Sequence, residues 1–370
     1  EKIDNVPGDE TSRNEQKGQA LFLRAWNYHM LYSLFGRVPI VDHTFDLDSS
    51  FELQREDMDK VADFIIKDLD EAAALLPIEY NDPNDFGRVT KGAALALKSR
   101  VLLYKASPLF GTPSTEKWQA AANAAKAVFD LNKYYLKTVN NREEYGALFY
   151  DVKNPEVIFE KLFDPKYGSG DNNSFLYQAP CGIGNGFQGW GNFNPTQNLV
   201  DKFQMADGTA SEKKTHYDYY PWNGREIRFY AAFLLDGDEW GYGKDKREVE
   251  VYYGGDETIP AGKDSNWGEY WWNASNTGYS MRKFLDPSYD ATGTTMHTTP
   301  WFFIRLSEIY LNYAECQIEL GNNSEALEYI NKVRTRALLP PATGEDIRAE
   351  YEYERQIELV FEGQRWFDLR

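Results

Sequence analysis

Apolar residues recur at intervals of three and four over the first 130 residues and again over the last 70, which is the spacing of one face of an α-helix. The segment 17–36 shows the pattern clearly and ends at Gly36, three residues before Pro39. Its expected buried face is Leu21, Ala25, Tyr28, Tyr32 and Phe35. Both ends of the chain are therefore predicted to be helical.

Five further helices follow from the same spacing, with Thr90 as the expected N-cap of the helix that starts at residue 91. The expected buried faces are Met58, Val61, Ile65, Leu69, Ala72 and Leu76; Trp118, Ala122, Ala125 and Phe129; Ile309, Tyr313, Cys316 and Leu320; and Ala326, Ile330, Val333 and Ala337. A last helix is expected over 346–362. Short connections between these helices suggest antiparallel pairs, and Ala125 with Phe129 weakly matches the tetratricopeptide pattern.

The middle of the chain has a different composition. Residues 168–293 hold 18 of the 28 glycines, residues 151–300 hold six of the ten tryptophans, and the one expected strand is 156–160. So many aromatic residues argue against disorder. We expect a mostly α fold of one domain over 1–370, with an α-solenoid-like base of helical pairs from about 15–135 and 301–370. A loop-rich, aromatic-rich insertion is expected over about 150–300.

Charge, cysteines and motifs exclude several classes of function. The net charge of −18 argues against a nucleic-acid-binding protein, which needs a basic surface. Cys181 and Cys316 have no metal or disulfide-framework spacing, the four histidines have no metal spacing, and the glycine-rich segment 181–191 is not followed by a helix as a dinucleotide loop requires. We expect no cofactor and no metal.

A glycoside hydrolase needs two carboxylates that face each other across a sugar. Glu354, Glu358 and Glu362 recur at helical spacing, but arginines share their helix and the preceding one. A structural ion network is the favoured interpretation, and a hydrolase stays open as a second alternative to a binding protein.

Two aromatic loops, 181–193 and 265–280, are the candidate ligand site. Sugar rings stack on Trp and Tyr through their CH-rich faces, and amide side chains can bond their hydroxyls. Each ring could instead fill a small core beneath the loops. The candidate residues are Phe187, Gln188, Trp190, Asn192, Trp267, Tyr270, Trp271, Trp272, Asn273, Asn276 and Tyr279.

Several segments in order resemble one family. ALFLRAWNYHMLYSLFGRVPIV, DMDKVADFIIKDLDEAAALLP, GRVTKGAALALKSRVLLYKASPLF, NLVDKFQMADG, RLSEIYLNYAECQIELG, ALEYINKVRTRALLP and ERQIELVFEGQRWFDLR are similar to successive motifs of the SusD/RagB family of glycan-binding outer-membrane lipoproteins. The resemblance covers most of residues 15–370.

The resemblance implies a tetratricopeptide-like base, an oligosaccharide ligand, no catalytic residues, and delivery of the glycan to a SusC-like TonB-dependent transporter. It places the protein on the extracellular face of the outer membrane, held by a lipid anchor that this sequence lacks. Family members carry more sequence at both ends, so both family termini are expected to be truncated here. The alternative from another class is a helical-repeat scaffold that binds a protein or peptide on its concave helical face.

Overall fold

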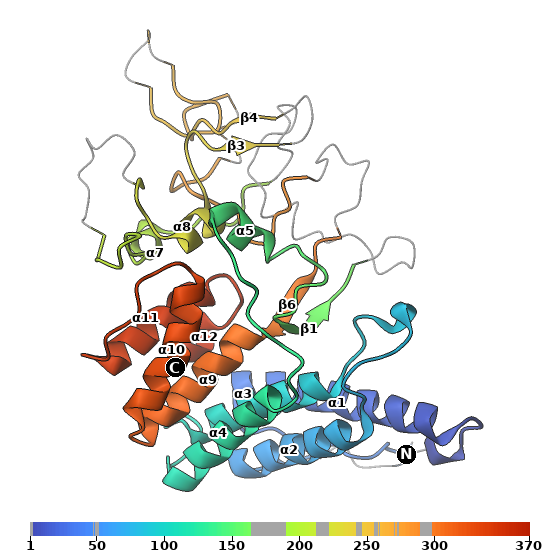
Figure 1. Ribbon diagram of the computed structural model, residues 1–370. Helices are drawn as coiled ribbons and strands as arrows, with labels where there is room; N and C mark the ends of the chain where they lie inside the picture. Colours follow the sequence, from blue (N-terminus) through green and yellow to red (C-terminus); the bar gives the residue numbers. More distant parts are fainter. Residues whose placement is uncertain are drawn as a thin grey trace.

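The computed structural model describes residues 3–46, 48, 52–163, 190–211, 222–241, 246–254, 258, 260–269, 271, 274–288 and 298–370. Figure 1 shows a base of long helices from both ends of the chain and, above it, a layer of short elements joined by long loops. The mostly α fold class predicted from the sequence is confirmed, with a helical base and a loop-rich insertion.

The base contains the long helices, which pack against their neighbours in the chain. They are α1 (Glu10–Phe35), α2 (Met58–Leu75), α3 (Lys91–Ala106), α4 (Thr115–Phe129), α9 (Leu306–Glu319), α10 (Asn323–Arg336) and α11 (Ile347–Glu358), followed by the short α12 (Arg365–Asp368). Helix α4 packs against α9, so the N-terminal and C-terminal helices form one continuous base. Two 3₁₀ turns, η1 (Ile3–Asn5) and η2 (Pro83–Asp85), lie before α1 and between α2 and α3.

Local sequence explains where these helices begin and end. Asp9, Thr90 and Ser114 each accept a hydrogen bond from a backbone N–H of the first turn of α1, α3 and α4. Gly36 ends α1 with φ 67°, a conformation that favours glycine. The expected N-cap at Thr90 is confirmed.

The predicted helical faces form the core of the base, with two corrections. The apolar face of α2 is buried as expected from Val61 to Leu76. On α1, Phe22 is fully buried rather than Leu21, and Phe35 is 66% exposed, because the core that covers this helix ends one turn earlier at Tyr32 and Ser33.

The last predicted helix is shorter than expected. It ends at Glu358 rather than at residue 362, because Phe361 and Gly363 adopt positive φ angles of 64° and 78°. This break turns the backbone, and Glu362 comes to lie against Lys283 and Arg305.

In the part that the structure describes, the insertion and the segments that join it to the base contain short elements. These are α5 (Arg142–Ala147), β1 (Val157–Lys161), α7 (Gln197–Val200), α8 (Ile227–Ala232), β2 (Phe233–Leu234), β3 (Glu239–Trp240), β4 (Arg247–Glu248), β5 (Ser280–Met281) and β6 (Trp301–Arg305). Three antiparallel pairs form, β1 with β6, β2 with β5 and β3 with β4. The β1–β6 pair connects the insertion to α9, and β1 begins one residue later than predicted.

In the part of the chain that the structure describes, no helix combines the length and the apolar character needed to cross a membrane.

Candidate functional site

Large aromatic side chains lie exposed on the insertion, where they could contact a ligand. Trp267 and Trp271 are 75% and 64% exposed. Both were predicted as ligand-binding residues, and so was Trp190, which is also exposed. The other large exposed rings of the described insertion are Phe193, Tyr252 and Tyr253. We call these six residues the exposed aromatic set: Trp190, Phe193, Tyr252, Tyr253, Trp267 and Trp271.

A compact turn holds Trp267 in place. The Gly268 N–H donates to Ser265 O at 2.9 Å, and the Trp267 N–H donates to Ser265 Oγ at 3.3 Å. Gly268 approaches the backbone so closely that a Cβ atom built there would lie 2.0 Å from Gly262 O. Only glycine fits this position without a shift of the turn.

The same turn is fastened to the strand that leads to Tyr252. Arg247 makes two bonds to the Asp264 carboxylate, with N–O distances of 2.8 and 2.7 Å. Asp264 also accepts the Glu250 N–H at 3.0 Å, and the Gly262 N–H donates to Tyr252 O at 2.9 Å. A paired arginine and carboxylate thus connect β4, in the segment before Tyr252, to the Trp267 turn.

A second part of the exposed aromatic set lies on the segment before α7. Trp190 and Phe193 are exposed there beside Asn192, another predicted ligand residue. The Thr277 hydroxyl donates to Pro195 O at 2.7 Å, which joins this segment to the loop carrying Asn276, also exposed. The structure therefore joins the segment that follows the first predicted aromatic loop to the second loop.

Tyr279 corrects the expectation of an exposed ring. It is 8% exposed, packs with Phe233 and Phe203 in a small core, and donates its hydroxyl to Gln197 Oε1 at 3.0 Å. Burial raises its pKa. The ring fastens the loop to α7 rather than offering a face to a ligand.

Five other predicted residues lie outside the described part of the chain. They are Phe187, Gln188, Tyr270, Trp272 and Asn273. Conversely, the composition argument missed Phe193, Tyr252 and Tyr253. The adjacent tyrosines beside Gly254 carry the same combination of ring and glycine that marked the other two loops.

Under the insertion lies a buried network of charged side chains. Glu358 is completely buried, and Arg228, Arg305 and Arg336 all bond its carboxylate. Burial works against ionisation of Glu358, but the three arginines outweigh it and hold its pKa well below the usual range. Glu362 bonds Lys283, whose pKa burial lowers to about 8. The predicted ion network is confirmed, with Arg228, Arg305 and Lys283 as partners that the sequence spacing did not identify.

This network removes the regularly spaced glutamates from any cleft, since the arginines occupy their carboxylates. His29 is 3% exposed inside the base. Within the described ranges no group of histidine, cysteine, aspartate and glutamate side chains is arranged to hold a metal ion.

Comparison with known proteins identifies the family. A model described as the SusD family matches residues 155–370. The chain belongs to the SusD family. A second model, described as starch-binding and associating with the outer membrane, matches residues 1–103. The resemblance seen in the sequence motifs is therefore confirmed.

SusD-like structures share the fold over nearly the whole chain. A SusD-like protein from Bacteroides fragilis is 29% identical, with a TM-score of 0.83 over 99% of this chain and 70% of its own. A SusD-like carbohydrate-binding protein from the same species is 26% identical, with a TM-score of 0.79 over 98% of this chain and 67% of its own. SusD-like protein P25 of Formosa agariphila is 23% identical over 99% of this chain. The chain spans 66% of the length of that relative.

Proposed function

We propose that the exposed aromatic set binds oligosaccharide, and that this SusD family chain captures glycan at the outer membrane without chemical turnover. The observation that carries the proposal is the exposure of six large rings on the insertion. Hydrogen bonds hold the Trp267 turn against the segment before Tyr252 and join the segment after Phe193 to Thr277. Exposed rings can stack on sugar faces, and a preformed turn lowers the entropy lost on binding. The carbohydrate-binding description of the B. fragilis relative and the starch-binding family model support the same ligand class.

Amide side chains complete the proposed site. Asn192 and Asn276 lie exposed beside the rings of the segment before α7, where each could both donate to and accept from sugar hydroxyls. Phe187, Gln188, Tyr270, Trp272 and Asn273 remain part of the proposed site on the sequence argument. Open sites of this kind bind with free energies of about 4 to 8 kcal/mol, which corresponds to millimolar to micromolar affinity.

The glycan would then pass to a SusC-like TonB-dependent transporter, with the protein held on the extracellular face by a lipid anchor. The helical base offers a surface for such a protein partner. Helix α1 exposes an apolar row that a partner would cover: Leu23, Met30, Leu31, Leu34 and Phe35. Substituting Leu31 and Phe35 by serine is expected to reduce co-purification with the transporter while leaving glycan affinity unchanged.

Isothermal titration calorimetry against α-glucans, β-glucans, fructans, mannans, xylans and pectic fragments tests the binding proposal. Saturable heat with one glycan class, without release of reducing sugar, is the expected result. Release of reducing sugar would instead establish a hydrolase. Absence of heat across the panel, together with binding of a protein or peptide by the helical base, would establish the scaffold alternative.

A further inference from the structure

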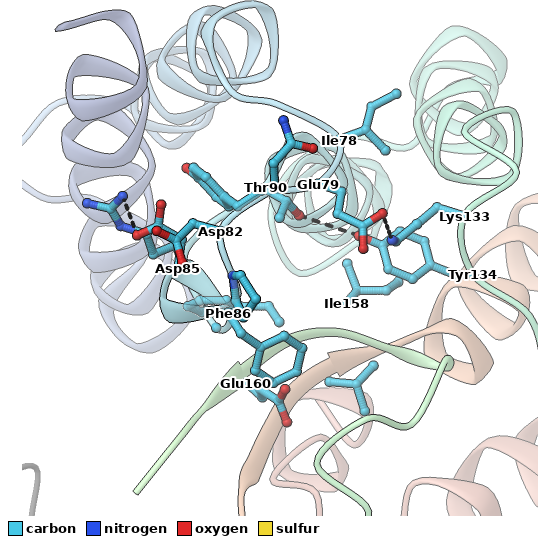
Figure 2. A pocket seen from close by; sticks show the side chains of 17 residues that line it. Ile78, Glu79, Asp82, Asp85, Phe86, Thr90, Lys133, Tyr134, Ile158 and Glu160 are labelled. Carbon is cyan, nitrogen blue, oxygen red and sulfur yellow. Dashed lines mark hydrogen bonds and ion pairs between the residues drawn. The ribbon is translucent and has the colours of Figure 1, made fainter. Parts of the chain in front are cut away.

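A cavity of about 350 Å³ lies between the α2–α3 connection and strand β1, and none of the exposed aromatic set lines it. Figure 2 shows this cavity with Phe86, Tyr134, Ile158 and Glu160 around it. In Figure 1 the α2–α3 connection stands beside β1, whereas β3 and β4 lie at the top of the molecule. Its volume is near the lower end of the range of about 300–1,000 Å³ that small-ligand pockets occupy. The space suits a ligand of about one sugar ring.

Rings and aliphatic side chains form much of the wall, and hydrogen bonds fix two of the rings. Tyr80 donates its hydroxyl to Val89 O at 3.0 Å, and the Tyr134 hydroxyl lies 3.4 Å from Thr90 Oγ1. Phe86 is half exposed at the cavity, and Ile158 is buried. The apolar part of the wall is thus preformed, as in most small-molecule sites.

Charged side chains around the cavity disfavour an anionic ligand. Glu79 pairs with Lys133, and Asp85 pairs with Arg88 at 2.9 Å. The positive charges of Lys133 and Arg88, which line the cavity, are therefore already paired. Asp82 accepts the Asn84 N–H at 2.8 Å and adds a further negative charge. A carboxylate, sulfate or phosphate group would enter a site with more acceptors than donors.

Glu160 supplies a polar group, one oxygen of which has no hydrogen-bond partner in the described part of the chain. It lines the cavity, and its Oε2 atom is buried with no hydrogen-bond partner among the described residues. Burial, with a smaller repulsion from Asp151, raises its pKa to about 8, so the carboxyl is mostly protonated at neutral pH. A protonated carboxyl both donates and accepts, which matches a hydroxyl group.

We infer that this cavity is a second carbohydrate site, which holds one neutral sugar ring with its hydroxyls toward Glu160 and its CH-rich face on Phe86. The inference rests on the proposed function for its ligand class and adds a location and a charge preference to it. A cation is disfavoured because three of the four carboxyl groups that line the cavity are already engaged and no metal-holding group occurs among the described residues.

Ligand-observed NMR titrations with D-glucose, D-galactose, D-mannose and D-xylose test this site, with D-glucuronate and D-glucosamine as charged comparisons. At least one neutral sugar is expected to bind saturably. Glu160→Leu and Phe86→Ala are each expected to weaken it about tenfold, equivalent to about 1.4 kcal/mol. Glu160→Gln, which keeps a donor and an acceptor, is expected to retain affinity within about twofold.

The variant Trp267→Ala with Trp271→Ala separates the two sites, because it should leave monosaccharide binding in the cavity unchanged. Phe86 is half exposed, so Phe86→Ala is expected to fold. This variant therefore tests the site even if Glu160→Leu does not fold. Unchanged binding in Phe86→Ala, or no saturable neutral sugar at all, would overturn the cavity site without touching the oligosaccharide result on the aromatic set. Tighter binding of glucuronate or glucosamine than of every neutral sugar would overturn the charge preference.

Discussion

Trp240 and Trp271 carry the same side chain in one insertion, but one is buried and the other is exposed. Trp240 is 3% exposed and packs with Leu234, Val249 and Leu285 in a small core. Trp271 is 64% exposed. Burying an aromatic side chain of this size yields a few kcal/mol, at about 25 cal/mol per Å². A ligand that stacks on an exposed ring gains part of this free energy.

Removing the exposed tryptophans should therefore affect binding and spare stability. Trp267→Ala combined with Trp271→Ala is expected to weaken oligosaccharide binding by more than about tenfold, or about 1.4 kcal/mol, by calorimetry. The melting temperature should change little, since neither ring is buried. Trp366, 62% exposed on α12 of the base, provides the matched control, and Trp366→Ala should leave both quantities unchanged. A large fall in melting temperature for the double variant would mean that these rings are structural.

Tyr279 is expected to give the opposite result. Tyr279→Ala should lower the free energy of unfolding by about 3–5 kcal/mol, the usual cost of deleting a buried ring. Tyr279→Phe removes only the bond to Gln197 and should cost about 1 kcal/mol. Urea unfolding measures both. If Tyr279→Ala lost glycan affinity at full stability, the ring would be a binding platform after all.

The contrast between Trp271 and Tyr279 shows what the sequence could not provide. Composition alone placed both rings in one predicted ligand loop, 265–280. Which ring is covered depends on a partner 82 residues away, because Gln197 receives the Tyr279 hydroxyl and Pro195 receives that of Thr277. Exposure of a loop residue is a tertiary property, and no local pattern encodes it.

Helices are more predictable because their period is local. The face of α2 followed from the spacing of its apolar residues, and the helix ends at Thr90 and Gly36 followed from the residue types there. The error at Phe35 arises at a helix end, where the surrounding core, rather than the period, decides burial. The glutamates of α11 were correctly assigned to ion pairs, but Arg228 and Arg305 come from α8 and β6, and sequence spacing cannot relate those elements to α11.

That network connects the insertion to the base, so breaking it should weaken the whole molecule. Glu358→Gln removes one negative charge shared by Arg228, Arg305 and Arg336 and leaves three buried cations undercompensated. The expected loss at neutral pH is about 3–5 kcal/mol in the free energy of unfolding. Glu352→Gln, at an exposed position of the same helix, is the control and should change stability little.

The pH dependence of stability carries the same signature. The arginines hold the pKa of Glu358 below its ordinary value of 4.5, so the folded state binds fewer protons than the unfolded state in that range. The contribution of ionised Glu358 to the free energy of unfolding is therefore present above about pH 4.5 and is lost as the pH falls further through the pKa of the folded state. Melting temperatures measured from neutral to acid pH should show this loss, and Glu358→Gln should make the acid limb shallower. An acid limb of unchanged steepness in the variant would assign the loss to other groups.

The turn that carries Trp267 allows a test at the level of a single element. Gly268→Ala would place a Cβ atom 2.0 Å from Gly262 O and 2.8 Å from the carbonyl carbon of Lys263, so the turn must move. Glycan affinity is expected to fall about tenfold while the base keeps its helical circular dichroism. Gly146→Ala in α5 is the matched control, because its Cβ would meet only Ala231 at 3.9 Å. Equal affinities in the two variants would show that the Trp267 turn takes no part in binding.

At the scale of the whole molecule, the charge of the chain bears on the choice of glycan. The net charge of −18 creates a negative field around the protein that repels acidic polysaccharides at low ionic strength. Neutral glycans carry no charge for this field to act on. A surface of exposed rings and amides, with a cavity surrounded by carboxyl groups, fits neutral sugars at both proposed sites.

Salt should therefore distinguish the two classes of ligand. For a neutral oligosaccharide, the dissociation constant is expected to stay within about twofold between about 0.01 and 1 M NaCl, because stacking and hydrogen bonds to uncharged groups are not screened. Any acidic glycan that binds should bind more tightly as the salt concentration rises. The distance over which the repulsion acts, the Debye length, falls from about 30 Å to about 3 Å over this range. Calorimetric titrations of a neutral glucan and a pectic fragment across this range make the comparison. An acidic fragment whose binding weakens with added salt would reveal a local basic site that outweighs the acidic surface, and the ligand class would have to be revised accordingly.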